Sequence, residues 1–98
     1  MPSIKALIAE AKAELFARHG RHDDAIAELQ SACAFWNLAA SPINIAEARL
    51  RLADLLISTG DTSAAEIERR AARSIGEELG SLRIKRRVGD IEAVVKVG

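Results

Sequence analysis

Apolar residues recur every three or four positions along five stretches of the chain, with short breaks between them. Residues at this spacing share one face of an α-helix, so the pattern predicts five amphipathic helices and favours no strand. We expect the apolar stripe of each helix to form its packed face. The stripes are Ile4-Leu7-Ile8-Ala11-Leu15, Ala25-Leu29-Ala32-Cys33-Trp36, Ala46-Leu50-Ala53-Ile57, Ala64-Ile67-Ala71-Ile75-Leu79 and Ile84-Val88-Ile91-Val95.

The breaks carry residues that begin and end helices. Gly20 ends the first helix, because glycine tolerates the left-handed conformation common at helix C-termini, and Gly60 and Gly80 mark later turns. Pro42 disfavours helix at Ser41, so the third helix is expected over about 45–58. The expected N-cap residues are Ser3, Asp23 or Asp24, and Ser81.

The chain also matches itself at an offset of 40 residues. A repeat of this length is typical of stacked helix pairs, in which each unit buries its face on the next. Such arrays commonly bind other proteins. The matching residues are Ala6, Ala13, Leu15, Gly20, Ala25, Glu28 and Ala32, which recur as Ala46, Ala53, Leu55, Gly60, Ala65, Glu68 and Ala72.

Composition narrows the choice of function. Fourteen basic and fourteen acidic residues give a net charge of zero, which argues against a general nucleic-acid binder. The single cysteine, Cys33, allows no internal disulfide and no cysteine-based zinc site. Charged residues interrupt the apolar stretch near the N-terminus, so we expect no signal peptide, no membrane span and a cytoplasmic location.

The two glycine turns, over 20–26 and 60–66, resemble the helix–helix junction of the tetratricopeptide repeat, in which a small alanine stands five positions after the glycine. Lys12 and Arg69 depart from the family pattern, and the period of 40 is similar to the longer repeats of bacterial signal-responsive regulators. The resemblance implies one domain over 1–98, an all-α, right-handed stack of antiparallel hairpins. It would comprise repeats over about 3–40 and 43–80 and a terminal helix over about 81–97.

The same resemblance implies a concave groove, lined by the first helix of each repeat and by the terminal helix, that holds a peptide or helix of another protein. Its net charge of −3 favours a basic or mixed partner segment, although a solvated helix face explains the pattern equally well. The implied groove residues are Leu7, Glu10, Glu14, Arg18, Glu47, Leu50, Asp54, Ser58, Arg87, Asp90 and Val94.

Two alternatives use the C-terminal part of the chain. Surplus apolar surface on the terminal helix favours either a capping helix or a homodimer. The residues for self-association are Leu82, Ile91, Val94, Val95 and Val97. A basic cluster over 83–87, with Arg69, Arg70 and Arg73, could bind nucleic acid or a regulator, but nearby glutamates favour a paired, solvated surface.

Catalysis is the function that the sequence favours least. No glycine-rich phosphate loop and no nucleophile–base pair at local spacing is present, so we expect no enzyme and no cofactor. His19 and His22, beside two aspartates, fit a polar turn better than a metal site, and Cys33 shares its stripe with Trp36, as core residues do. Phe35 lies off that stripe and is the better candidate for a surface contact.

Overall fold

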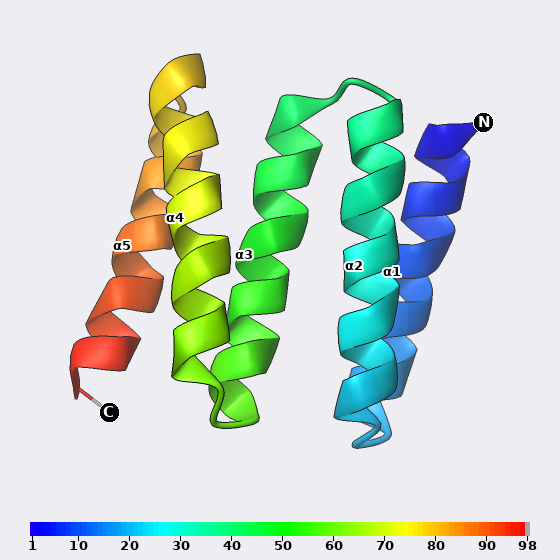
Figure 1. Cartoon of the computed structure of the whole chain (residues 1–98), viewed down its shortest axis with the longest axis horizontal. Coiled ribbons are helices and arrows are strands. Elements are labelled where there is room, and N and C mark those ends of the chain that lie inside the picture. The colour runs from blue at the N-terminus through cyan, green and yellow to red at the C-terminus, as the bar shows by residue number, and fades with distance from the viewer. Residues whose placement is uncertain (98) are drawn as a thin grey trace.

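The computed structural model describes the backbone of residues 1–97 and the side chains of residues 1–94. In this range the chain forms five α-helices and no strand, which confirms the all-α prediction (Figure 1). The helices are α1 (Pro2–Arg18), α2 (His22–Leu38), α3 (Pro42–Ser58), α4 (Thr62–Leu79) and α5 (Leu82–Val97). None of them is both long and apolar enough to cross a lipid bilayer.

One kind of turn joins every pair of successive helices. A residue with positive φ stands at each of positions 20, 40, 60 and 80, and the N–H of the next residue donates to the carbonyl five positions back. These bonds, of 2.8 to 3.1 Å, close a Schellman motif, which satisfies the last carbonyls of each helix. Three of the four residues are glycine, and Ala40 adopts φ 52 despite its Cβ. The backbone therefore repeats every 20 residues, half the period of the sequence match.

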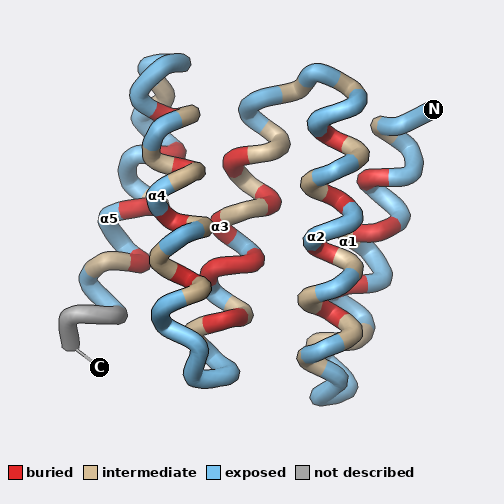
Figure 2. The backbone as a smooth tube through the Cα atoms, viewed as in Figure 1, coloured by how far each residue is buried: buried red, intermediate tan, exposed pale blue. Residues whose placement is uncertain are grey.

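The five helices form a thin array in which neighbours along the chain are neighbours in space. The array measures 38 × 34 × 17 Å, and α1 and α5 lie at its opposite ends (Figure 1). Helix α3 contacts α2, α4 and α5, and α1 packs on α2. Buried residues line the surfaces at which the helices meet (Figure 2).

Two hydrophobic clusters form the core. The larger one contains Leu50, which is completely buried, and extends from Ala13 of α1 and Leu29 of α2 through α3 to α4 and α5. The smaller one surrounds Trp36 and joins α1 to α2, with Ala48 of α3. Small residues dominate the interface of the first hairpin, where Ala6, Ala9 and Ala32 are buried. Because their side chains are small, the two helices can pack closely.

The expected packed face is wrong for two helices. In α1 the buried residues are Ala6, Ala9 and Ala13, and the stripe from Ile4 to Leu15 lies on the surface. In α4 the buried residues are Ala65, Arg69, Ala72 and Gly76, and Ile67 is exposed. Both helices bury a face of small residues, which allows close packing but gives a weak hydrophobic signal in the sequence.

The expected N-cap residues of α1 and α2 are wrong, and α3 begins earlier than expected. Helix α1 begins at Pro2, so Ser3 lies inside it, and α2 is preceded by Arg21, with both aspartates inside its first turn. Helix α3 starts at Pro42, because proline suits the first helical position. The Ser81 N-cap is confirmed, because its Oγ accepts a 3.3 Å hydrogen bond from the N–H of Ile84.

Candidate functional site

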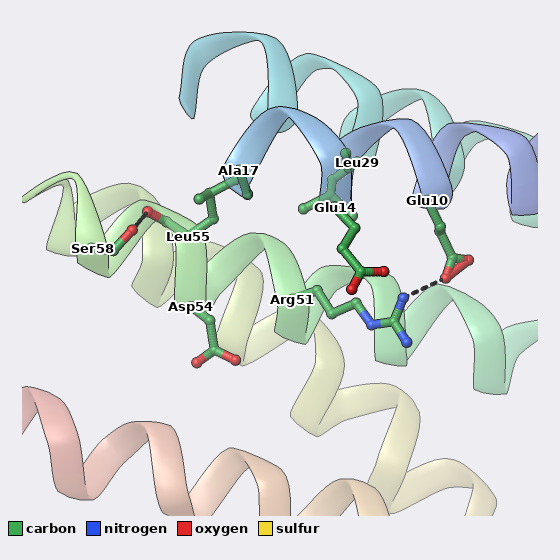
Figure 3. Close-up of a pocket in the computed structure, with 9 residues that line it drawn as sticks. Glu10, Glu14, Ala17, Leu29, Arg51, Asp54, Leu55 and Ser58 are labelled. Atoms are coloured by element: carbon green, nitrogen blue, oxygen red, sulfur yellow. Dashed lines mark hydrogen bonds and ion pairs between the residues drawn. The ribbon is translucent and has the colours of Figure 1, made fainter. Parts of the chain in front are cut away.

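A groove of about 550 Å³ opens between α1 and α3 (Figure 3). Its apolar lining comes from small and aliphatic residues of three helices, Ala13, Ala17, Leu29 and Leu55. Its polar lining comes from α1 and α3 alone, and consists of Glu10, Glu14, Arg51, Asp54 and Ser58. Three carboxylates against one guanidinium leave the groove with a net charge of −2.

Glu10 is the most buried charged residue of the groove, with 17% of its side chain exposed. One carboxylate oxygen accepts a 2.9 Å hydrogen bond from Nε1 of Trp36, and the other accepts from Nη1 of Arg51 at 2.9 Å. Trp36 is itself buried, as its place in the apolar stripe predicts. Glu10 is therefore a fixed structural part of the groove, since both of its oxygens are already bound.

Glu14 and Asp54 are more accessible. Glu14 pairs with Arg18 at 2.8 Å, and Asp54 pairs with Arg87 at 3.2 Å. The side chains of Glu14, Asp54 and Arg18 are more than half exposed, and such pairs contribute little free energy in water. Both carboxylates can therefore exchange their present partner for an incoming cation at low cost.

Four of the predicted groove residues line this groove together: Glu10, Glu14, Asp54 and Ser58. The prediction is wrong for Leu50, which is completely buried in the larger core cluster. Leu7, Asp90 and Val94 are exposed but do not line the groove. Glu47 pairs with Arg83, and Arg18 and Arg87 reach the groove only through their carboxylate partners.

Arg51 is the charged groove residue that the sequence analysis did not predict, and the apolar lining residues, Ala13, Ala17, Leu29 and Leu55, were not predicted either. Figure 3 shows Glu14 extending from α1 towards Arg51, while the Arg51 guanidinium reaches Glu10. The signal was present, because Arg51 stands four residues after Glu47 and three before Asp54, on the same helix face. The comparison of the two repeats did not single out Arg51, because the equivalent residue of the first repeat is the uncharged Ala11.

The basic residues near the C-terminus are mostly engaged with carboxylates. Arg83 pairs with Glu47, and Arg69 and Arg73 both pair with Glu92. Arg69 also binds Glu66, as the spacing of three predicts, and the Arg69 hydrogen bonds lower the pKa of Glu66 to about 2. Arg70, four residues after Glu66 on the same helix, pairs with it at 3.0 Å. This surface is therefore largely charge-neutralised, which weakens the nucleic-acid alternative.

The terminal helix offers less free apolar surface than its sequence predicts. Ile91 is buried in the larger core cluster, so its assignment to a self-association surface is wrong. Leu82 and Val94 are exposed, as that alternative requires. The side chains of Val95 and Val97 lie outside the described residues.

The remaining candidates show no reactive arrangement. Burial raises the pKa of the Cys33 thiol to about 11, which disfavours the nucleophilic thiolate. Among residues 1–94, no group of three histidine, cysteine or acidic side chains is placed to hold a metal ion. Phe35 is partly buried, and its ring lies 5.9 Å from Nζ of Lys5, a cation–π contact between α2 and α1.

The groove combines an apolar floor with carboxylates at its rim. A lysine or arginine side chain has the complementary form, because its aliphatic stem packs on apolar surface while its charged end reaches an acid. Comparisons of the chain with protein-family models, with curated proteins and with solved structures find no match, so the chemistry of the groove itself is the basis for assigning a ligand class.

Proposed function

We propose that this chain is a non-catalytic protein-recognition domain that binds a basic segment of a partner protein in the groove between α1 and α3. The observation that carries the proposal is that Glu14 and Asp54 both line one groove with apolar residues, beside a Glu10 carboxylate held in place by Trp36 and Arg51. Carboxylates around an apolar floor select for cations and against acidic ligands.

We also propose that the helices stack as two tetratricopeptide-like pairs followed by a single helix. Three features support this arrangement. The alanines that follow the glycine turns, Ala25 and Ala65, are buried, α2 packs on both α1 and α3, and α5 packs on both α3 and α4. In such a stack, α1, α3 and α5 would line the binding side. This placement agrees with a groove whose polar lining comes from α1 and α3.

The exposed ion pairs indicate how a ligand would enter. In the free protein Arg18 pairs with the carboxylate of Glu14, and Arg87 pairs with that of Asp54. A cation of the ligand would replace one of these arginines. An incoming lysine or arginine would displace one of them and add contact with Leu29 and Leu55. Binding of this kind weakens with salt, because the exposed charges are screened.

The proposal can be tested with blocked ten-residue peptides that carry one central arginine between leucines, and with matched peptides that carry glutamate or norleucine there. Titration into the ¹⁵N-labelled protein should shift the amide signals of Ala17, Asp54 and Ser58 for the arginine peptide. Glu14→Lys and Asp54→Lys should each weaken binding about fivefold or more. Glu78→Lys is the matched control, because Glu78 is an exposed acid on α4 away from the groove.

Three results would contradict the proposal. The first is equal binding of the arginine and glutamate peptides. The second is a set of shifts confined to α4 and α5. The third is binding that Glu78→Lys weakens as much as Glu14→Lys does. Circular dichroism of each variant separates a loss of binding from a loss of fold.

A further inference from the structure

The apolar stripe of α1 is a second surface, distinct from the groove. Ile4, Ile8 and Leu15 are 54, 50 and 56% exposed, and their spacing places them on one helix face with Ala11. α1 lies at the end of the array (Figure 1), and its other face, of alanines, packs on α2. Exposed apolar residues that share one helix face form a candidate interaction surface.

The same face is buried in the last helix of the array. Residues 80 positions after the α1 stripe are Ile84, Val88 and Ile91, which are 0, 3 and 4% exposed. They belong to the cluster by which α5 packs on α4 and α3. The stripe of α1 therefore corresponds to the face by which α5 packs on α4 and α3, and in α1 this face is exposed.

One position at the edge of this face recurs every 40 residues, at Lys12, Leu52 and Glu92. Glu92 of α5 pairs with Arg69 and Arg73 of α4. Forty residues earlier, Leu52 of α3 and Leu29 of α2, the counterparts of Glu92 and Arg69, belong to the same buried cluster. The third member of this series is Lys12 of α1, for which the complementary partners are carboxylates.

The end of the face imposes a size requirement. Ile84 packs on Gly76 of α4 so closely that a Cβ there would lie 2.6 Å from Cγ2 of Ile84. Ile4 occupies the corresponding position of α1 and has the same side chain. A helix that covers α1 in the same way therefore needs a small residue opposite Ile4.

We propose that this face of α1 docks an amphipathic helix of a partner protein that carries two carboxylates four residues apart opposite Lys12. The partner helix would also carry a glycine or alanine three residues after its second carboxylate, opposite Ile4. This spacing is that of α4, where Gly76 stands three residues after Arg73 and packs on Ile84. A second copy of this chain is the poorer occupant. The α4 helix of a second copy would place Arg69 and Arg73 against Lys12, which is a contact of like charges. In addition, α5 of that copy already covers the face of α4 that carries these arginines.

Two peptides, each held in a helix by a cross-link between its own side chains, test the proposal on the 98-residue chain. One has the sequence of residues 62–79 with Arg69→Glu and Arg73→Glu, and the other has the unchanged sequence. The acidic peptide should bind at least about fivefold more tightly by calorimetry, and Lys12→Glu in the protein should reverse that preference. Ile8→Ser and Leu15→Ser should each abolish binding, whereas Ile67→Ser, at an exposed apolar residue of α4, should not.

Several outcomes would overturn the proposal. They are failure of the acidic peptide to bind, equal affinity for the two peptides, and binding that survives Ile8→Ser together with Leu15→Ser. Sedimentation supplies a further one: a dimer of the wild-type chain that Ile8→Ser dissociates would make a second copy the occupant. Because Ile8 and Leu15 are half-exposed, these variants are expected to fold, and circular dichroism verifies it.

Discussion

Trp36 and Glu10 are joined by a 2.9 Å hydrogen bond from the indole N–H to a carboxylate oxygen, within the first helical hairpin. The second oxygen of Glu10 binds Arg51 of α3, so a single carboxylate connects α1, α2 and α3 at the groove. Trp36 fills the smaller core cluster, and Arg51 lines the groove. Packing of the first hairpin and the shape of the groove are therefore coupled through Glu10.

Glu10→Ala is expected to destabilise the protein by about 1–3 kcal/mol, because it leaves the buried indole N–H without an acceptor. Glu10→Gln should cost less, since an amide oxygen can still accept from Trp36 while the charge opposite Arg51 is lost. Urea unfolding followed by tryptophan fluorescence measures both changes. Glu14→Ala is the matched control on the same helix, and its exposed carboxylate predicts a change within about 0.5 kcal/mol.

Gly76 and Gly89 provide opposite predictions for the same substitution. Gly76→Ala would place a Cβ against Ile84 and is expected to cost about 1–3 kcal/mol, even though alanine favours helix. A Cβ at Gly89 would meet no atom of a neighbouring helix within 4 Å, so Gly89→Ala should stabilise α5 by about 0.5–1 kcal/mol. Thermal unfolding of the two variants checks this. A similar shift of both melting temperatures in one direction would contradict the close α4–α5 contact.

Glu66 predicts how stability responds to acid. Its pKa lies near 2 in the folded chain, below the ordinary value of 4.5, mainly because of the hydrogen bonds from Arg69. A lowered carboxylate pKa contributes stability above the ordinary pKa, and this contribution is lost as the pH falls from 4.5 through 2. The urea midpoint of the wild type should therefore fall over this window. Glu66→Gln should flatten the fall, and Glu77→Gln, at an exposed acid on the same helix, should leave it unchanged.

The sequence pattern was sufficient for the number and type of elements. Stripes at helical spacing and glycine turns specify five helices, and the structure has them within a few residues of the expected bounds. The third helix shows the limit, because Pro42 begins it rather than preceding it. Proline can either interrupt a helix or occupy its first position, and the sequence alone does not distinguish the two. In the structure the preceding helix ends in the turn at Ala40, so Pro42 takes the first position of α3.

Which face of a helix is buried was harder to predict. Hydrophobicity alone selects Ile4 and Leu15 over Ala6 and Ala13, yet the alanines are buried because they permit close packing on α2. The same difficulty explains Leu50, which stands near Asp54 on α3 but points into the core. The acids of the groove were expected from the resemblance to tetratricopeptide repeats, whereas the hydrogen bond between Trp36 and Glu10, 26 residues apart, has no local signal in the sequence.

Cys33 yields a prediction about reactivity that a catalytic or redox role would contradict. Burial raises the pKa of its thiol to about 11, above the ordinary value of 9.0, so less thiolate is present near neutral pH. The higher nucleophilicity of a more basic thiolate offsets part of this loss, which leaves about a tenfold slower reaction. Alkylation with iodoacetamide near pH 8 should therefore be about tenfold slower in the folded protein than in concentrated urea. Reaction of the folded protein as fast as the unfolded chain would mean that the thiol is activated and accessible.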